Sequence, residues 1–377
     1  MNLALRDIRH NLGRFLLTCL GLSLLLGVVM SMIGIYRGLV ADALGIARAP
    51  AAQIWVVEAK SRGPFAEASR IPGDTREAIA RIAGVQDAGS VTYQSVEASF
   101  RGRPLRLYVI GFEPGRPGGP RVLTEGRPIT RTRFEMIADS RGGLTIGDVV
   151  TMGRSRFHVV GTTTGQVASG GDPVVYVTLK DSQRLQFDLT PSAQRREQAR
   201  GASGASSDIV NAVVTTLIPN ASTGLVGDTI RRWKHLNALS QDEQETILTR
   251  SVVEMARRQI GLFTSLLLTV SAVIIALIIY TLTIDKLREI ATLKLIGAPD
   301  SVIVGLIVQQ AVAMGVIGFG FGLALILTIK DRFPRRVVIE PSDVGILALI
   351  ILAVCIVASG LGVRLALKVD PARALGG

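Results

Sequence analysis

Four long runs without a charged residue divide the chain. Phe15–Tyr36 and Gln259–Ile284 enclose a long polar insertion, while Ser301–Ile329 and Val344–Val363 follow close behind. A helix needs roughly 20 apolar residues to cross a bilayer, so each run predicts a transmembrane helix. The predicted spans cover residues 15–37, 259–284, 301–329 and 344–363. The first run is longer than the apolar part of a secretory signal, which favours an anchor that is retained.

The segments outside the spans have different characters. Residues 1–14 place Leu5, Ile8 and Leu12 at helical spacing among arginines, which predicts an interfacial helix on an anionic leaflet. Residues 38–257 are long enough to bury a core of their own. The remaining segments are a charged stretch at 285–300, a short outer loop at 330–343 and a tail at 364–377.

The insertion predicts an α+β domain with two lobes. A helix is expected from Pro72 to Ile82, followed by a hairpin of Val91–Phe100 and Leu105–Phe112. A Gly/Pro-rich break at Pro114–Pro120 separates this hairpin from a second group of strands. These are expected at Phe134–Ala138, Asp148–Met152, Phe157–Gly161 and Val174–Leu179.

The end of the insertion turns back toward helix. Pro191–Asp208 is polar and rich in Ala, Gly and Ser, which predicts a mobile surface loop at 191–208. Ile209–Ile218 is expected to be a strand that returns to the first lobe. Two helices follow at Ala221–Leu236 and Gln241–Arg258, and the second predicts a stalk at 241–258 that runs into the next span.

The charged stretch DKLREIATLKLIGAPDS lies between two spans, so it must lie at one membrane face. Leu287, Ile290, Ala291 and Leu293 can form one apolar helical face. Gly297 then accepts a left-handed cap, and the Pro that follows opens the next helix. Such a short amphipathic helix is suited to contact a soluble partner; the alternative is an ordinary solvated loop.

Composition agrees with a membrane protein. The chain of 377 residues is 48% hydrophobic with only 5% aromatic residues, and its mean hydropathy is +0.40. Its net charge of +12 comes from dispersed, Arg-rich positions, which favours anionic lipid over nucleic acid as a partner. Cys19 and Cys355 both fall inside predicted spans, so they define no disulfide framework.

Catalytic and ligand-binding motifs are absent from the sequence. No GxxxxGK[ST] loop, GxSxG elbow or HExxH pair occurs, and the three histidines are isolated. We therefore expect a non-catalytic chain with no cofactor or metal of its own. The spans contain no internal charge, which disfavours an ion-driven transporter. Gly318 and Gly322 form a GxxxG spacing that permits close helix packing.

The basic-aromatic run RRWKH at 231–235 is open to two interpretations. Arginine with an indole could engage lipid phosphate near a membrane. The alternative is a solvated helix face with Trp233 packed inward.

The segment KLREIATLKLIGAPDSVIVGLIVQQA resembles the coupling region of MacB/FtsX-type permeases, also called type VII ABC transporters, and among them the DevC-like stand-alone members. The N-terminal LALRDIRHNLGRF and the C-terminal KVDPARAL extend the resemblance over nearly the whole chain. LTIGDVVTMGRSRFHVVGTTTG is similar to the small β-rich lobe of MacB-type domains.

The resemblance implies a homodimeric permease subunit in a bacterial inner membrane, with both termini in the cytoplasm. Two copies of a separate ATPase subunit would bind ATP and Mg²⁺ and press on the coupling helix. An adaptor of the membrane-fusion type and an outer-membrane duct would receive exported lipid, glycolipid or amphiphile. The residues that the resemblance assigns to ATPase coupling are Lys286, Leu287, Arg288, Glu289, Ile290, Leu293, Lys294, Gly297 and Ala298.

Two other functions remain open on the sequence. An FtsX-like switch would activate a cell-wall hydrolase through the inserted domain, although that domain is larger here than in FtsX proteins. A membrane receptor without an ATPase would leave the coupling stretch without a purpose.

Overall fold

The computed structural model describes residues 12–65, 67, 69–131, 133–168, 170–189, 208–297, 299–333 and 335–367. The predicted interfacial helix before residue 12, residues 191–207 of the loop predicted at 191–208, Ala298 and the tail from residue 368 lie outside the described residues. The chain divides into a unit formed by residues 1–38 and 256–377, and a unit formed by residues 39–255.

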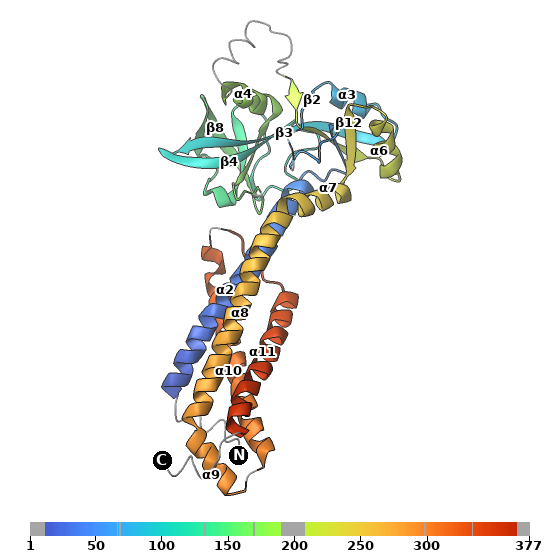
Figure 1. Ribbon diagram of the computed structural model, residues 1–377. Coiled ribbons are helices and arrows are strands. Elements are labelled where there is room, and N and C mark those ends of the chain that lie inside the picture. Colours follow the sequence, from blue (N-terminus) through green and yellow to red (C-terminus); the bar gives the residue numbers. More distant parts are fainter. Residues whose placement is uncertain are drawn as a thin grey trace. The chain divides into compact units, whose positions relative to one another are not determined.

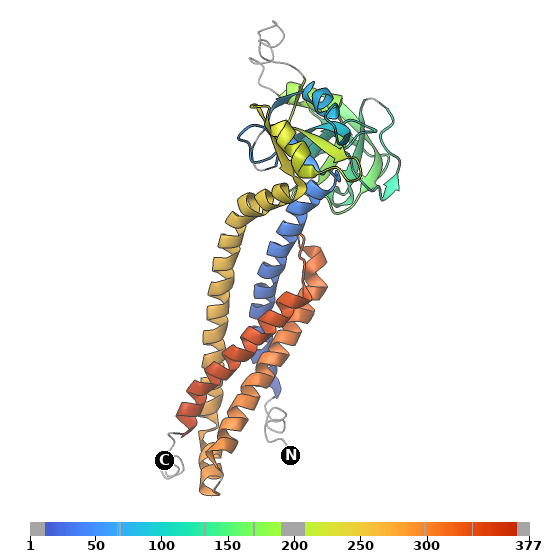
Figure 2. The same cartoon turned by 90° about the vertical axis from the view of Figure 1, so that its right-hand side faces the viewer.

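The first unit is built from long helices, shown in Figures 1 and 2. Four of the described helices are long and apolar enough to cross a membrane, and a short helix, α9 (Leu287–Leu295), connects two of them. The prediction of four spans with an α+β domain inserted after the first is confirmed. The four helices are α2 (Leu12–Arg48), α8 (Glu254–Asp285), α10 (Asp300–Ile329) and α11 (Pro341–Leu367).

Helix α2 continues well beyond the predicted end of the first span at residue 37. It remains helical to Arg48 because Ala43, Ile46 and Ala47 carry an apolar stripe onward at helical spacing, and all three are buried. The charge of Arg37 therefore interrupts the apolar run without ending the helix.

Helices α2 and α10 cross where both carry glycine. A Cβ atom at Gly322 would lie 2.8 Å from the carbonyl oxygen of Ser23, and one at Gly318 would lie 2.9 Å from the Leu22 side chain. Gly27 on α2 faces the Gly322 carbonyl in return. The GxxxG spacing thus lies at a contact within one chain, where missing side chains let two backbones approach.

The segment before α11 is tied to α2 by polar contacts. Arg37 donates two hydrogen bonds of 2.8 Å to the Asp343 carboxylate and lies 3.0 Å from Glu340. The Val338 N–H donates to the Gly34 carbonyl at 3.0 Å, and a Cβ at Gly38 would collide with the Arg336 carbonyl. This clasp links the first span to the start of the fourth.

The second unit contains a mixed ten-stranded sheet with the order β12-β1-β11-β3-β4-β9-β6-β8-β5, and β7 pairs with β3 and β8. A separate pair joins β10 to β2. The strands are β1 (Ile54–Glu58), β2 (Ile71–Pro72), β3 (Val85–Phe100), β4 (Arg103–Phe112), β5 (Glu125–Gly126), β6 (Glu135–Asp139), β7 (Val149–Met152), β8 (Ser155–Thr163), β9 (Val174–Thr178), β10 (Ile209–Val210), β11 (Ala212–Leu217) and β12 (Leu236–Ser240). The helical segments are α3 (Thr75–Ala80), η1 (Ser140–Gly142), α4 (Leu179–Leu189), α6 (Thr223–Arg231), α7 (Gln241–Leu248) and η2 (Thr249–Val253).

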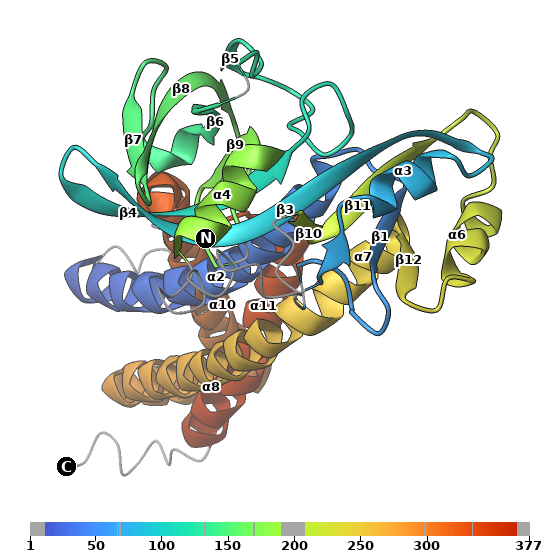
Figure 3. The same cartoon turned by 90° about the horizontal axis from the view of Figure 1, so that it is seen from above.

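Strand β3 joins the two lobes, as Figure 3 shows. Its first half pairs with β11 and its second half with β4, while Ala98 and Ser99 pair with β7. Val96 and Ala98 belong to the core of the β-rich small lobe, together with Phe157 of β8. Ala88 of the same strand belongs to the core formed with β1, α3 and α6. The lobes are therefore two packing regions of one sheet.

Most of the predicted strands are confirmed, including the β3–β4 hairpin and the return of β11 to the first lobe. The prediction of a helix over Ala221–Leu236 is wrong at its end, and strands β1 and β12 were not predicted. Helix α6 ends at Arg231, and turn hydrogen bonds at Trp233 and Leu236 redirect the chain into β12. Strand β12 then pairs along the whole of β1, a contact that local periodicity cannot show.

Of the two interpretations of the run at 231–235, the inward packing of Trp233 is confirmed, but the helix ends at Arg231 and Trp233 lies in the turn that follows. The Arg231 side chain donates to Asp228 at 3.1 Å, to Glu243 at 3.2 Å and to the Ala238 carbonyl at 2.7 Å. Trp233 packs against the core that contains Ile230. Both residues are engaged within the domain itself.

The region 241–258 is helical throughout but not uniform. Ser240 accepts from the Glu243 N–H, and the Glu243 side chain accepts from the Ser240 N–H, which forms a capping box for α7. A π-helical turn, η2, then leads directly into α8. Such turns usually mark an inserted residue or a functional adjustment in a helix.

Candidate functional site

The helix–turn–helix segment between α8 and α10 contains the residues that the sequence assigns to coupling. Helix α8 ends at Asp285 and Lys286 is the N-cap residue of α9, with its carbonyl accepting from the Ile290 N–H at 2.9 Å. Gly297 has φ +88°, which L side chains rarely adopt, and its N–H donates to the Lys294 carbonyl at 3.1 Å. Pro299 is the N-cap residue of α10.

Burial divides the apolar residues of α9 into two groups. Ile290 and Ala291 are 3% and 0% exposed, and Ile290 belongs to the core formed by the four long helices. Leu295 and Ile296, by contrast, are 61% and 79% exposed. The end of α9 therefore presents two adjacent apolar side chains beside the left-handed turn at Gly297.

Leu295 and Ile296 were not among the site residues predicted from the sequence. A signal was available, because both residues directly precede the glycine cap, where the helix ends and its packed face can no longer cover them. Side-chain positions of Leu287, Arg288, Glu289 and Leu293 lie outside the described part of the structure, so their assignment stays a prediction. Lys294 is partly buried, and Gly297 is exposed.

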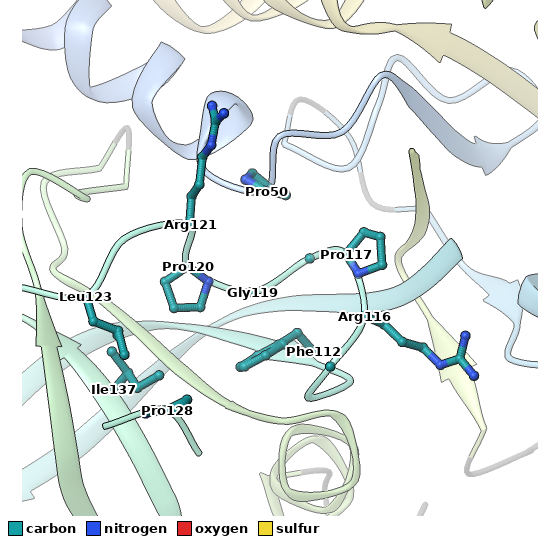
Figure 4. A pocket seen from close by; sticks show the side chains of 12 residues that line it. Pro50, Phe112, Arg116, Pro117, Gly119, Pro120, Arg121, Leu123, Pro128 and Ile137 are labelled. Atoms are coloured by element: carbon teal, nitrogen blue, oxygen red, sulfur yellow. The ribbon is translucent and has the colours of Figure 1, made fainter. Parts of the chain in front are cut away.

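A cavity of about 270 Å³ lies in the inserted domain below the Gly/Pro-rich segment, shown in Figure 4. Phe112, Leu123 and Ile137 give it an apolar floor. Arg116 at its rim is paired with Asp87 at 3.1 Å and with Glu113 at 3.4 Å, and burial raises the pKa of Glu113. Because this arginine is already neutralised, the cavity offers apolar contact at its floor and the charge of Arg121, which also lines it.

Among the described residues, no group of three or more His, Cys, Asp or Glu side chains could hold a metal ion. The two cysteines are buried in separate helices, α2 and α11. The candidate site on α9 is thus a contact surface and contains no reacting groups in the described part.

The long apolar helices and the inserted sheet domain together define a multi-pass membrane protein of the permease class. The family described as the MacB-like periplasmic core domain matches residues 15–232, and that described as the FtsX-like permease C-terminal domain matches residues 261–371. The chain belongs to the MacB/FtsX-type family of ABC transporter permeases. Membership implies an ATPase partner, since permeases of this class act with an ATP-hydrolysing subunit.

Relatives match over their full length. An uncharacterized ABC transporter permease of Mycobacterium tuberculosis strain H37Rv is 26% identical over 378 residues, which cover 99% of both chains. An uncharacterized ABC transporter permease of Mycobacterium bovis is 24% identical over 374 residues, again covering 99% of both.

Two solved structures also match the chain in part. The periplasmic region of MacB from Actinobacillus actinomycetemcomitans has a TM-score of 0.34 at 11% identity, covering 52% of this chain and 91% of that one. The extracellular domain of the noncanonic ABC-type transporter YknZ from Gram-positive bacteria has a TM-score of 0.35 at 11% identity, covering 50% and 100%.

Proposed function

We propose that this chain is the permease subunit of a mechanotransmission ABC exporter. The observation that carries the proposal is the exposed apolar end of α9, where Leu295 and Ile296 adjoin the turn at Gly297. Buried Ile290 anchors the same helix in the core of the long helices. A partner that displaces the exposed end would therefore move the core through a short, rigid element.

The path by which movement at α9 would reach the inserted domain is continuous along the chain. Helix α8 leads from Asp285 at its end back to Glu254, and helical structure continues through η2 into α7 of the inserted domain. A helix transmits axial displacement because each backbone hydrogen bond couples successive turns. Movement at α9 can thus reach the inserted domain without a flexible linker.

A separate ATPase subunit, present in two copies, supplies the energy in this proposal. ATP and Mg²⁺ bind to that partner, because this sequence has no phosphate-binding loop of the GxxxxGK[ST] type. The permease itself acts as a non-catalytic subunit.

Helix α8 supports a homodimer. It is the least buried of the four long helices: only 17% of the residues in its most apolar stretch are buried. Its exposed large side chains recur at intervals of three and four residues, which places them on one face that a second copy could cover. They are Leu262, Leu266, Val270, Val273, Leu277, Tyr280 and Ile284, and Phe263 is exposed next to Leu262.

The cargo in this proposal is a lipid, glycolipid or other amphiphile, passed to a periplasmic adaptor and an outer-membrane duct. The spans as predicted from the sequence contain no internal charge. They are suited to packing and transmitting movement rather than to lining a polar pore. Export would then depend on the inserted domain, in the periplasm, with both termini in the cytoplasm.

The coupling contact is tested by substitutions on α9. Leu295→Asp together with Ile296→Asp should abolish permease-stimulated ATP hydrolysis, because charged side chains would replace the apolar contact. Gly297→Val should do the same by straining the left-handed turn, and Glu289→Lys tests the predicted polar contact. Thr292→Ser on the same helix is the matched control. Membrane insertion should be unchanged in all variants.

Stimulated ATPase activity at the wild-type level in the Leu295/Ile296 double variant and in Gly297→Val would contradict the assignment of α9. Loss of copurification with the ATPase, at normal expression of the permease, would place the defect at the contact itself.

A further inference from the structure

A second, larger cavity lies in the small lobe at the sheet edge formed by β5, β6 and β8. Its volume is about 770 Å³, within the range of small-molecule sites. Strand β8 pairs with β5 on one side and with β6 on the other, so strands of one sheet supply part of the wall, and the turns that hold Arg131, Arg133 and Ile146 supply the rest. Four arginines line the cavity: Arg127, Arg131, Arg133 and Arg156.

Among the lining residues, one carboxylate, that of Glu135, offsets part of the positive charge of these arginines. Glu135 is 3% exposed and accepts from Arg127 at 2.6 Å. It also accepts from the backbone N–H groups of Thr130 and Arg131, both at 3.0 Å. The carboxylate is thus fully occupied in holding Arg127 and the adjoining backbone.

The other three arginines keep most of their donors free. Arg131 is 81% exposed and reaches Glu135 only at 3.7 Å. The guanidinium groups of Arg133 and Arg156 form no hydrogen bond or ion pair with the described residues, although the charge of Arg133 acts on the buried Asp181 carboxylate. A cluster of like charges repels itself unless an anion lies among them.

The backbone that presents these arginines is held in a strained conformation. Phe134 has φ +62°, an outlier for a bulky side chain, and its N–H donates to the buried Asp181 carboxylate at 2.9 Å. The His158 N–H donates to the Phe134 carbonyl at 2.8 Å, and the Phe134 ring meets Phe157 edge to face at 5.7 Å. Strain fixed by several contacts is typical of ligand-binding turns.

Apolar side chains adjoin the charged ones. Phe134, Ile146 and Val160 line the same cavity, and Ile146 is 47% exposed. A ligand that satisfies both kinds of wall carries an anionic group beside an apolar portion. Guanidinium forks match the oxygen geometry of phosphate, whose double negative charge suits more than one arginine.

We propose that Arg131, Arg133 and Arg156 bind the phosphate group of an amphipathic phosphate monoester, with its apolar portion against Phe134 and Ile146. The shared chemistry is the phosphate, whether it arrives free or as a lipid headgroup. This inference concerns binding alone and does not rest on the proposed export. A chain that binds phosphate esters but fails the coupling test would retain this site and lose the exporter assignment.

The test uses the full chain in nanodiscs of zwitterionic phosphatidylcholine, with empty nanodiscs as the blank. Titration calorimetry compares water-soluble dihexanoyl phosphatidic acid, inorganic phosphate and dihexanoyl phosphatidylcholine. The variant is Arg133→Gln with Arg156→Gln, which removes charge at side chains that make no bonds within the described structure. Arg154→Gln is the matched control, because Arg154 is exposed in the same lobe but does not line the cavity.

We expect the wild type and Arg154→Gln to bind dihexanoyl phosphatidic acid equally and to ignore dihexanoyl phosphatidylcholine. The double variant should lose affinity by roughly ten-fold or more, and wild-type affinity should fall as salt is raised. Weaker binding of inorganic phosphate, also lost in the double variant, would support the added apolar contact.

Three results would overturn the inference. They are no binding of either phosphate probe by the wild type, equal binding by the double variant, and tighter binding of hexaglutamate than of both probes. The last would assign the cavity to an acidic segment of a protein partner. Unchanged thermal midpoints of both variants show that any loss of binding does not come from unfolding.

Discussion

At the scale of single residues, Glu135 shows how a buried charge is kept ionised. The hydrogen bond from Arg127 lowers the pKa of this carboxyl to about 2, with further help from the N–H groups of Arg131 and Thr130 and against the effect of burial. Its folded-state pKa therefore lies below the ordinary value of 4.5. The ionised form stabilises the fold above the ordinary pKa, and this stabilisation is lost as pH falls from about 4.5 towards 2.

Glu135→Gln should lower the free energy of unfolding near pH 7 by about 3 kcal/mol, the linkage value of such a shift at about 1.36 kcal/mol per pH unit. The deficit relative to wild type should shrink between pH 5 and pH 2, because the wild type loses its own ion pair there. Thermal unfolding of the full chain in detergent micelles measures the difference. Glu97→Gln, at an exposed position on β3, is the control and should show no such trend. A deficit independent of pH would refute the linkage.

The conformation of a single residue could be predicted from the sequence where it depends on its neighbours in the chain. The left-handed cap at Gly297 follows from glycine before Ala-Pro-Asp, and its φ of +88° agrees. Nothing local marks Glu135 as buried, because its burial depends on β6 lying inside the sheet between β9 and β8. The arginine cavity was missed for the same reason, since Arg156 joins Arg131 and Arg133 only when β8 pairs with β6.

At the scale of elements, the crossing of α2 and α10 depends on absent side chains. Gly322→Val should destabilise the protein by about 1–3 kcal/mol or more, because its Cβ would meet the Ser23 carbonyl oxygen and displace a backbone. Gly320→Val is the matched control on the same helix, since a Cβ there meets nothing within 4 Å. Thermal midpoints of the purified variants decide the matter. Equal destabilisation by the two would mean that helix propensity, rather than the crossing, sets the effect.

Elements with strong periodicity or long apolar runs were predictable, and those defined by distant pairing were not. The β3–β4 hairpin follows from two alternating runs around Arg101 and Gly102. The earlier half of β3 was missed because its register partner, β11, lies more than a hundred residues later. Short strands such as β1 leave no periodic signal that separates them from buried helix.

At the scale of the whole molecule, the order of the spans along the chain predicts that Arg103 and Ile296 lie on opposite faces of the membrane. Arg103 begins β4 after the first span, and Ile296 follows the second; both are exposed. With Cys19 and Cys355 replaced by alanine, Arg103→Cys should react with a membrane-impermeant maleimide in intact spheroplasts. Ile296→Cys should react only after permeabilisation. The reverse pattern would invert the proposed orientation.

The choice between export and hydrolase control rests on what the small lobe contacts. Within this lobe, the segment Phe134–Leu179 includes β6 and β9, which are interior strands of the sheet, so deletion of the segment would remove the core. Single photo-crosslinking residues are therefore the sharper probe. Val149 is suitable because it is 40% exposed despite being apolar and does not line the arginine cavity. Leu225, 72% exposed on α6 in the other lobe, is the control position.

We expect a crosslinker at Val149 to capture a periplasmic adaptor of the membrane-fusion type, while Leu225 captures none. Exposed apolar side chains on a rigid sheet lobe suit a partner that must be held through repeated cycles of movement. Mass spectrometry of crosslinked products from intact cells identifies the partner, and copurification of the ATPase confirms that the variants remain assembled. Capture of a peptidoglycan hydrolase or its activator, with no adaptor recovered, would favour the FtsX-like switch, because the same lobe would then transmit force to an enzyme instead of passing cargo onward.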